Sequence, residues 1–309
     1  MHFQNYAEDI FLFLGILAGL CILCFFPSYE IEKVEFVNAP GLPPLLELHP
    51  GQLYLKDYPT DAKNLQLNNS ALTPLPQSQK LFFIAGIYGG TTKLLHGELV
   101  KAKHFFEGLL THPTRKVFRT YIKIKTDSVD SGNELRLPAN VQKRLKQVDD
   151  QKKIIDRNRL ITALNSEISS EEISCWKKPI NSRVTSYFGR PRTLPSGRSY
   201  YHSGVDLRAS VGVPIFNANE GTVVFADHMT VAGNNVIVSH GQGLFSRYMH
   251  LEKIKVALGD HIPTGHLIGL AGATGRVEAP HLHWEVIWKG NHADPLRFLQ
   301  DWAQICGPE

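Results

Sequence analysis

Cysteine is scarce in this sequence: four cysteines occur in 309 residues. So few exclude a small scaffold that depends on many disulfide bridges. Cys21 and Cys24 lie inside an apolar run, where a thiol behaves as a small hydrophobic side chain. Cys175 and Cys306 could pair in an oxidising compartment, but sequence alone does not place two Cα atoms within bonding range.

The sequence also lacks the signatures of nucleic-acid binding. It contains no P-loop and no basic stripe interleaved with aromatic residues, and its formal net charge is only +4. We therefore expect no nucleic acid among its partners. A mildly basic chain suits an anionic wall or membrane surface. The 43% of hydrophobic residues indicates packed cores rather than disorder.

One long uncharged run extends from Ile10 to Phe26. At about 1.5 Å per residue, it is at the short limit for crossing roughly 30 Å of hydrocarbon. A cleaved signal peptide is the competing interpretation. However, the segment before the run is acidic, and no small-x-small cleavage site follows it. We predict a single-pass transmembrane anchor over residues 1–27, left uncleaved.

The next part of the chain has the pattern of short strands. Residues 28–50 are rich in proline and charge and are predicted to be a linker. Over residues 51–127, apolar segments alternate with turn residues, and Val117–Lys125 has the period of two of a half-buried strand. We predict a small all-β domain here. It has no cluster of ligands or nucleophiles, so a spacer or docking role follows.

A helical period then replaces the strand period. Val141, Leu145 and Val148 recur at i, i+4 and i+7, which predicts a helical connector over residues 138–172. We expect one long helix with at most one break, joining the two domains. Proline at its start is tolerated in the first turn of a helix.

Residues 173–301 change character again, because glycine and proline punctuate β-branched runs. This predicts a second all-β domain, followed by a tail over residues 302–309. The predicted fold is therefore mostly β. The expected strands of the second domain are Thr222–Ala226, Asn235–Ser239, Phe245–Leu251 and Leu282–Trp288.

The candidate chemistry lies in this second domain. His202 and Asp206 form an H-x-x-x-D pattern, and His281 and His283 form an H-x-H pattern. Alternate residues of a strand project from one face, so both histidines of the second pattern can point at one spot. One of them, with His202 and Asp206, gives the three N/O ligands of a catalytic zinc. Because the chain has 14 histidines, spacing alone leaves this interpretation open.

Several short motifs surround these histidines in a fixed order. They include Phe188-Gly189, His202-Ser203-Gly204-Val205-Asp206, Tyr248-Met249-His250-Leu251, Thr274-Gly275 and Pro280-His281-Leu282-His283-Trp284-Glu285. In this order, residues 173–300 resemble the lysostaphin-type zinc endopeptidases, the family with the LytM catalytic fold. The resemblance implies a LytM-type sheet domain and a peptidoglycan hydrolase.

The resemblance also assigns roles to five residues. It implies that His202, Asp206 and His283 bind one Zn²⁺ per catalytic domain, and that His250 and His281 are the catalytic histidines. A zinc-bound hydroxide would attack the peptide bond. The two histidines would take its proton, stabilise the oxyanion, or divide these roles. No H-E-x-x-H motif is present, so no glutamate base of the thermolysin kind is expected.

The implied substrate is the stem-peptide cross-link of bacterial peptidoglycan. Cleavage between D-alanine and meso-diaminopimelate would make the protein a D,D-endopeptidase, whereas other relatives cut glycyl-glycine bridges. The anchor would hold the catalytic domain in the periplasm, at the inner membrane. We expect the upstream domain to cover the substrate groove until a regulatory protein partner moves it.

The sequence departs from the family pattern at His266, where glutamine is usual, and in one loop. Arg276-Val277-Glu278 replaces small residues, and Ala279 stands where glycine is usual, which affects specificity more than activity. Two alternatives stay open. One is a non-catalytic activator or binding protein of the cell wall that retains zinc, and the other is a secreted metallopeptidase of broad specificity.

Overall fold

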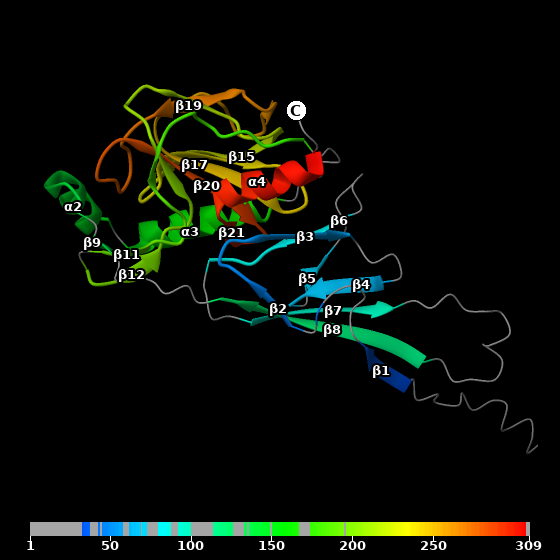
Figure 1. Ribbon diagram of the computed structural model, residues 1–309. Coiled ribbons are helices and arrows are strands. Elements are labelled where there is room, and N and C mark those ends of the chain that lie inside the picture. Colours follow the sequence, from blue (N-terminus) through cyan, green and yellow to red (C-terminus); the bar gives the residue numbers. More distant parts are fainter. Residues whose placement is uncertain are drawn as a thin grey trace, which may run out of the picture.

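Strands predominate in the part of the chain that the structure describes, as predicted (Figure 1). The predicted anchor over residues 1–27 lies outside that part, and no helix within it is long and apolar enough to cross a membrane. The structure is a computed structural model. It describes residues 33–37, 43, 45–57, 62–68, 70–72, 80–87, 92–99, 114–125, 133–134, 136–148, 150–166, 174–194 and 196–306.

The small β-domain contains a six-stranded sheet with the strand order β1-β8-β7-β4-β5, in which β2 also pairs with β8. Strands β3 and β6 form a separate two-stranded sheet. The bounds are β1 (Lys33–Val37), β2 (Leu45–Leu48), β3 (Leu53–Asp57), β4 (Ala62–Leu67), β5 (Ser70–Ala71), β6 (Lys80–Ile84), β7 (Thr92–Leu99) and β8 (Thr114–Ile124).

The alternation predicted for β8 is confirmed. Phe118 and Ile122 are fully buried, whereas Tyr121 between them is 50% exposed. The predicted linker over residues 28–50 is wrong where β1 and β2 lie. Strand β2 is too short to show a period by itself. Its parallel pairing with β8 and the burial of Leu48 make it part of the sheet.

The predicted helical connector consists of two helices, α2 (Ala139–Lys146) and α3 (Asp150–Leu164). They correspond to the expected helix with one break. Leu160, Ala163 and Leu164 of α3 pack against a buried cluster of the second domain that includes Phe225 and Met229. The connector therefore lies along the second domain.

The second domain is built on a ten-stranded sheet with the central order β10-β13-β20-β17-β16-β15-β18, and the four strands predicted for it are confirmed. Outside this sheet, β9 (Asn133–Glu134) pairs with the hairpin of β11 (Pro191–Thr193) and β12 (Ser199–Tyr201). The sheet strands are β10 (Val184–Ser186), β13 (Val205–Arg208), β14 (Pro214–Phe216), β15 (Gly221–Met229), β16 (Gly233–Ser239), β17 (Leu244–Ile254), β18 (His261–Ile262), β19 (Leu267–Ala271), β20 (His281–Trp288) and β21 (Asn291–Ala293).

The last helix, α4 (Pro295–Cys306), extends into the predicted tail. A tail beginning at residue 302 is therefore wrong as far as Cys306. Phe298 and Trp302 are one helical turn apart, and both are buried, so the apolar face of the helix continues past the predicted boundary.

The two domains share one continuous hydrophobic core. The ring of Phe82 on β6 lies 5.3 Å from that of Trp288 and 5.9 Å from that of Trp302. The backbone N–H of Asp294 donates to the carbonyl oxygen of Gly51 at 3.0 Å. Figure 1 shows β3 and β6 beside α4 and β21. The small β-domain is thus docked on the second domain.

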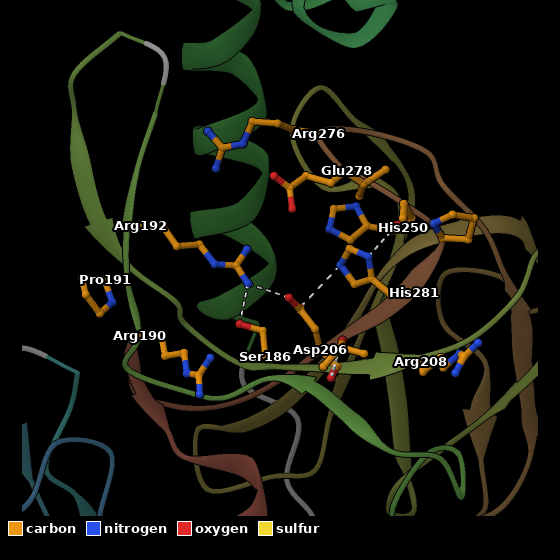
Figure 2. A pocket seen from close by; sticks show the side chains of 14 residues that line it. Ser186, Arg190, Pro191, Arg192, Asp206, Arg208, His250, Arg276, Glu278 and His281 are labelled. Carbon is orange, nitrogen blue, oxygen red and sulfur yellow. Dashed lines mark hydrogen bonds and ion pairs between the residues drawn. The ribbon is translucent and has the colours of Figure 1, made fainter. Parts of the chain in front are cut away.

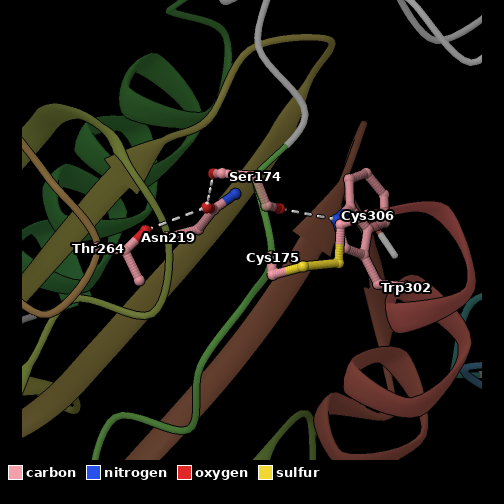
Figure 3. The surroundings of a disulfide bond; sticks show 6 residues. All are labelled: Ser174, Cys175, Asn219, Thr264, Trp302 and Cys306. Carbon is pink, nitrogen blue, oxygen red and sulfur yellow. Dashed lines mark hydrogen bonds between the residues drawn. A yellow bond between two sulfur atoms is a disulfide. The ribbon is translucent and has the colours of Figure 1, made fainter. Parts of the chain in front are cut away.

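A disulfide closes the second domain (Figure 3). It joins Cys175 to Cys306, whose Cα atoms are 5.3 Å apart and which are separated by 131 residues in sequence. Beside it, Nε1 of Trp302 donates to the carbonyl oxygen of Ser174 at 3.1 Å. The segment before β10 is therefore linked covalently to α4.

We predict that replacing both Cys175 and Cys306 by serine lowers the free energy of unfolding by about 2–5 kcal/mol, because the loop that the bridge closes is long. Urea unfolding of the zinc-loaded variant measures the loss. Wild-type protein unfolded with a reducing agent is the control and should show the same loss. Equal midpoints for the oxidised wild type and the variant would contradict the prediction.

Candidate metal centre

The predicted ligands come from neighbouring strands of the ten-stranded sheet. Asp206 lies on β13 and His283 on β20, and the antiparallel register places them directly opposite each other. His202 lies between β12 and β13. Leu282 and Trp284 on either side of His283 are fully buried, as strand alternation requires. The sheet thus brings three residues that are distant in sequence to one point.

Gly204, between two of these residues, allows the segment to lie against β20. A Cβ atom on Gly204 would lie 2.3 Å from the carbonyl oxygen of Trp284 and 2.9 Å from Nε2 of His283. Both contacts are too short for any side chain. Glycine is therefore required within the H-S-G-V-D motif by close approach to the strand that carries a predicted ligand.

The three donor atoms converge on one buried point. Oδ1 of Asp206 lies 3.0 Å from Nε2 of His202 and 2.7 Å from Nδ1 of His283, and these two nitrogens are 2.9 Å apart. All three side chains are buried. Two imidazole nitrogens and one carboxylate oxygen are a ligand set that zinc prefers.

In His202 and His283, the ring nitrogen that faces away from the centre makes its own hydrogen bond. This bond determines which nitrogen of the ring carries the lone pair. Nδ1 of His202 donates to the carbonyl oxygen of Tyr187 at 2.8 Å, so its Nε2 carries a lone pair. Nε2 of His283 lies 3.3 Å from a carboxylate oxygen of Glu285, which accepts a hydrogen bond from Nε2–H when Nδ1 faces a metal. Two lone pairs and a carboxylate at one buried point require a positive charge between them.

Without a metal, that positive charge would be a proton. Burial acts to lower the pKa of His283, but hydrogen bonds to Asp206 and Glu285 outweigh it and raise the pKa to about 9. Burial acts to raise the pKa of Asp206, but its close contacts with the imidazoles of His202, His281 and His283 hold it well below its ordinary value. Asp206 is therefore ionised, and the donor set fits a divalent cation.

The two predicted catalytic histidines lie beside this point. The ring centres of His250 and His281 are 5.0 Å apart, and that of His250 is 6.1 Å from that of His283. Nδ1 of His250 donates to the carbonyl oxygen of Thr274 at 2.9 Å, and Nδ1 of His281 to that of Ala279 at 2.8 Å. In the neutral form of either ring, Nε2 is therefore the nitrogen that can accept a proton. The structure thus brings all five predicted residues together.

His250 has an unusual backbone. Its φ of 65° is uncommon for a residue other than glycine, and its N–H donates to the carbonyl oxygen of Ala232 at 2.9 Å. Burial lowers the pKa of His250 well below its ordinary value, and the nearby His281 and His283 lower it further. The surrounding structure therefore holds a neutral imidazole in a strained position, a feature that is frequent at functional sites.

Sequence reasoning missed Arg192. Its Nη2 donates to Oδ2 of Asp206 at 2.6 Å and to Oγ of Ser186 at 2.8 Å (Figure 2). The contact leaves Oδ1 of Asp206 to face the two imidazoles. No local motif marks Arg192, because the fold alone brings the β11–β12 hairpin beside β13.

Two clefts, each of about 370 Å³, meet at the metal centre. Arg192, His250 and Arg276 line both of them. Asp206 and His281 also line the first cleft, and His202 and His283 the second. The converging donors therefore lie at the boundary between two open spaces, where an extended substrate can pass across them.

An all-β domain with a buried His-Asp-His donor set, two further histidines and open clefts defines a metal-dependent hydrolase domain. Residues 200–295 match the family model described as Peptidase family M23. The chain therefore carries a peptidase family M23 domain, and M23 metallopeptidases use zinc. The family resemblance seen in the motifs is confirmed for this domain.

Individual relatives match parts of the chain. Over 156 residues it is 34% identical to the peptidoglycan DD-endopeptidase ShyA of Vibrio cholerae serotype O1, covering 47% of this chain and 36% of that protein. Over 114 residues it is 38% identical to ShyC, a peptidoglycan DD-endopeptidase of the same organism, covering 37% of this chain and 26% of that protein. The chain thus aligns with about a third or less of the length of these relatives.

Solved structures extend the comparison beyond the M23 domain, and one of them matches most of this chain. It is a putative M23 peptidase from Pseudomonas aeruginosa, with a TM-score of 0.52 and 22% sequence identity. The match covers 81% of this chain and 93% of that one. At this identity the match shows a shared fold, in which the upstream region and the M23 domain are both included.

We predict that Arg192→Met weakens zinc affinity by about 10–100-fold, because the hydrogen bond that orients a liganding carboxylate is lost. Competition with a chromophoric chelator measures the affinity. Arg190→Met is the matched control. The side chain of Arg190 lies over the ring of Tyr187, and its contact with His202 is made by the backbone carbonyl oxygen, which the substitution keeps. Unchanged zinc affinity in Arg192→Met would mean that Asp206 needs no such support.

Proposed function

We propose that this protein is a zinc-dependent endopeptidase that hydrolyses the peptide cross-links of bacterial peptidoglycan, as a D,D-endopeptidase. The observation that carries the proposal is the convergence of His202, Asp206 and His283 beside His250 and His281, where two clefts meet. The names of ShyA and ShyC, both peptidoglycan DD-endopeptidases, support this substrate class.

His202, Asp206 and His283 would hold the metal. A bound zinc ion polarises a carbonyl group and lowers the pKa of a water molecule. His250 and His281 each have Nδ1–H tied to a backbone carbonyl, so each can receive a proton at Nε2. Once protonated there, either ring can donate a hydrogen bond to the developing oxyanion, and can then transfer the proton to the nitrogen of the leaving amine.

Digestion of purified sacculi and of casein by the zinc-loaded protein, with mass spectrometry of the products, tests the proposal. We expect loss of cross-linked dimers from sacculi and little cleavage of casein. Cleavage of casein as the main activity would instead indicate a peptidase of broad specificity. Zinc binding without any cleavage would indicate a non-catalytic wall-binding or activator protein.

We further propose that α3 restricts entry to the second cleft. Lys153, Asp156, Arg157 and Leu160 of this helix line the cleft together with His202 and His283. Among the described residues, none that line either cleft come from β1 to β8. The helical connector, rather than the small β-domain, therefore covers the groove, and a regulatory partner would act by displacing it.

We predict that the double variant Asp156→Ala/Arg159→Ala digests sacculi several-fold faster than wild type. Oδ2 of Asp156 accepts the N–H of Thr230 at 2.7 Å, and Nη1 of Arg159 donates to the carbonyl oxygen of His228 at 3.1 Å. Losing both contacts should raise the population in which α3 has moved away. Lys152→Ala, on the exposed side of the same helix, is the control.

An unchanged or slower rate would show that α3 does not limit access. Point variants suit this test better than a protein truncated to residues 173–309. The truncation would also remove β3 and β6, whose side chains share the core with α4. It would therefore expose apolar surface on the catalytic domain and confuse loss of inhibition with loss of stability.

We also propose that the protein acts in the periplasm, held at the inner membrane by residues 10–26. The disulfide between Cys175 and Cys306 supports an oxidising compartment, and the uncharged run supports an anchor. Protease digestion of spheroplasts and of whole cells tests both points. Protection of the protein in spheroplasts would contradict the periplasmic location.

A further inference from the structure

The first cleft has an excess of positive charge. Four arginines line it, Arg190, Arg192, Arg208 and Arg276, together with two carboxylates. One carboxylate, Asp206, is paired with Arg192 and belongs to the predicted metal site. The other, Glu278, accepts the backbone N–H of Arg136. The cleft therefore has more guanidinium groups than carboxylates to neutralise them.

Of these four arginines, Arg276 is the one whose guanidinium is best placed to bind a substrate. It is half-buried and, among the described residues, forms no ion pair with a carboxylate. Its guanidinium lies 5.1 Å from the ring centre of Tyr200, and its backbone N–H donates to the carbonyl oxygen of Val231 at 2.9 Å. The loop and the ring thus hold the side chain in place while leaving its charge uncompensated.

Arg276 lies close to His250, one of the two predicted catalytic histidines. It lines both clefts together with His250, and the carbonyl oxygen that holds His250 belongs to Thr274, two residues earlier. Figure 2 shows Arg276 and Arg192 reaching into the same space from different segments. A group held by Arg276 therefore lies next to the bond that is cut.

Neighbouring cations make it more favourable for an anionic group to bind beside Arg276. Burial lowers the pKa of Arg276, and Arg192 and Arg198 nearby lower it further, although Tyr200 acts in the opposite direction. A guanidinium that is partly desolvated beside other cations, without a carboxylate partner, is costly unless a ligand supplies one. A planar guanidinium matches a carboxylate in geometry as well as charge.

We propose that Arg276, with Arg192 beside it, forms a subsite for a free carboxylate of the substrate on the amine side of the scissile bond. This inference rests on the proposed function. In a cross-link between D-alanine and diaminopimelate, the carbon that bears the scissile nitrogen also carries a free carboxylate. A glycyl-glycine bridge has no such group within the chain. The subsite therefore selects the diaminopimelate type of link.

Two synthetic cross-linked peptides that differ in one group test this subsite. One carries the free carboxylate beside the scissile bond, and the other carries a carboxamide there. For the full zinc-loaded chain, we expect kcat/KM to be about 10–100-fold higher for the carboxylate, since a charge-assisted pair is lost with the amide. A glycine-bridged peptide should be cut no faster than the amide.

Arg276→Met should lower kcat/KM for the carboxylate peptide to about that for the amide peptide, so that the preference between the two peptides is lost. Arg276→Lys should keep part of the preference, because it retains the charge without the planar fork. Arg198 is an exposed arginine of the β11–β12 hairpin that lines neither cleft, so Arg198→Met should keep the full preference for the carboxylate peptide. A purely structural role for Arg276 would lower both rates together.

The inference is overturned if wild type cuts both peptides equally, or if Arg276→Met slows both by the same factor. If Arg276→Met fails to fold or to bind zinc, the Arg276→Lys preference decides between the outcomes. If wild type cuts neither peptide, the proposed function fails. Calorimetric binding of the two peptides to the zinc-loaded protein then tests the subsite, with equal affinities counting against it.

Discussion

Replacing His283 by alanine should remove both the metal and the activity. His283 supplies one of three converging donors, and the other two cannot hold zinc tightly by themselves. We expect the zinc content to fall from about one ion per chain to near zero, and peptidoglycan cleavage to fall by about 10³-fold or more. Elemental analysis of the purified protein and muropeptide release measure the two effects.

The same substitution at another histidine of the domain is the matched control. His261 lies on β18, where it is exposed and pairs with Glu220 at 2.9 Å, away from the three donors. His261→Ala should keep both zinc and activity. A His283→Ala protein that still binds one zinc ion per chain would place the metal elsewhere and remove the basis of the proposed mechanism.

The candidate site could be predicted from the sequence because its residues lie within recognisable local patterns. The H-x-H pattern depends on strand alternation, which the burial of Leu282 and Trp284 confirms. The H-x-x-x-D pattern is accompanied by a glycine that packing against β20 requires. In both cases neighbouring residues in the chain carry the information.

Features that depend on contacts between distant segments could not be predicted. Arg192 reaches Asp206 because its hairpin folds beside β13 and pairs with β9, which lies far upstream in sequence. Strand β2 is defined by its partner β8 rather than by its own four residues. The docking of the small β-domain on α4 depends on Phe82, which looks like an ordinary core residue in sequence.

The position of α3 beside the metal centre also depends on contacts between distant segments. An upstream domain with no chemistry of its own is the natural candidate for a cover, and the sequence gives no sign that the connector would be closer to the site. Asp156 and Arg159 are typical surface residues of a charged helix, yet both bond to the strand-to-strand segment around Thr230 or to β15. Only the fold shows that one face of α3 lines the second cleft.

Replacing His250 should separate catalysis from metal binding. Its ring contributes none of the three converging donors, and its Nδ1–H is bound to the carbonyl oxygen of Thr274. Without an acceptor at Nε2, we expect cleavage to fall by about 10²–10⁴-fold while zinc content stays near one ion per chain. Comparison of muropeptide release with elemental analysis tests both halves of this expectation.

The choice of substitution matters, because the φ of 65° at His250 is unfavourable for alanine by roughly 1–2 kcal/mol. Asparagine tolerates this conformation and has no comparable basicity, so His250→Asn removes the proton acceptor with less backbone strain. Both variants should be inactive with zinc bound, and His250→Asn should be the more stable in urea. If His250→Asn keeps wild-type activity, proton transfer does not pass through this residue, and His281 must supply it alone.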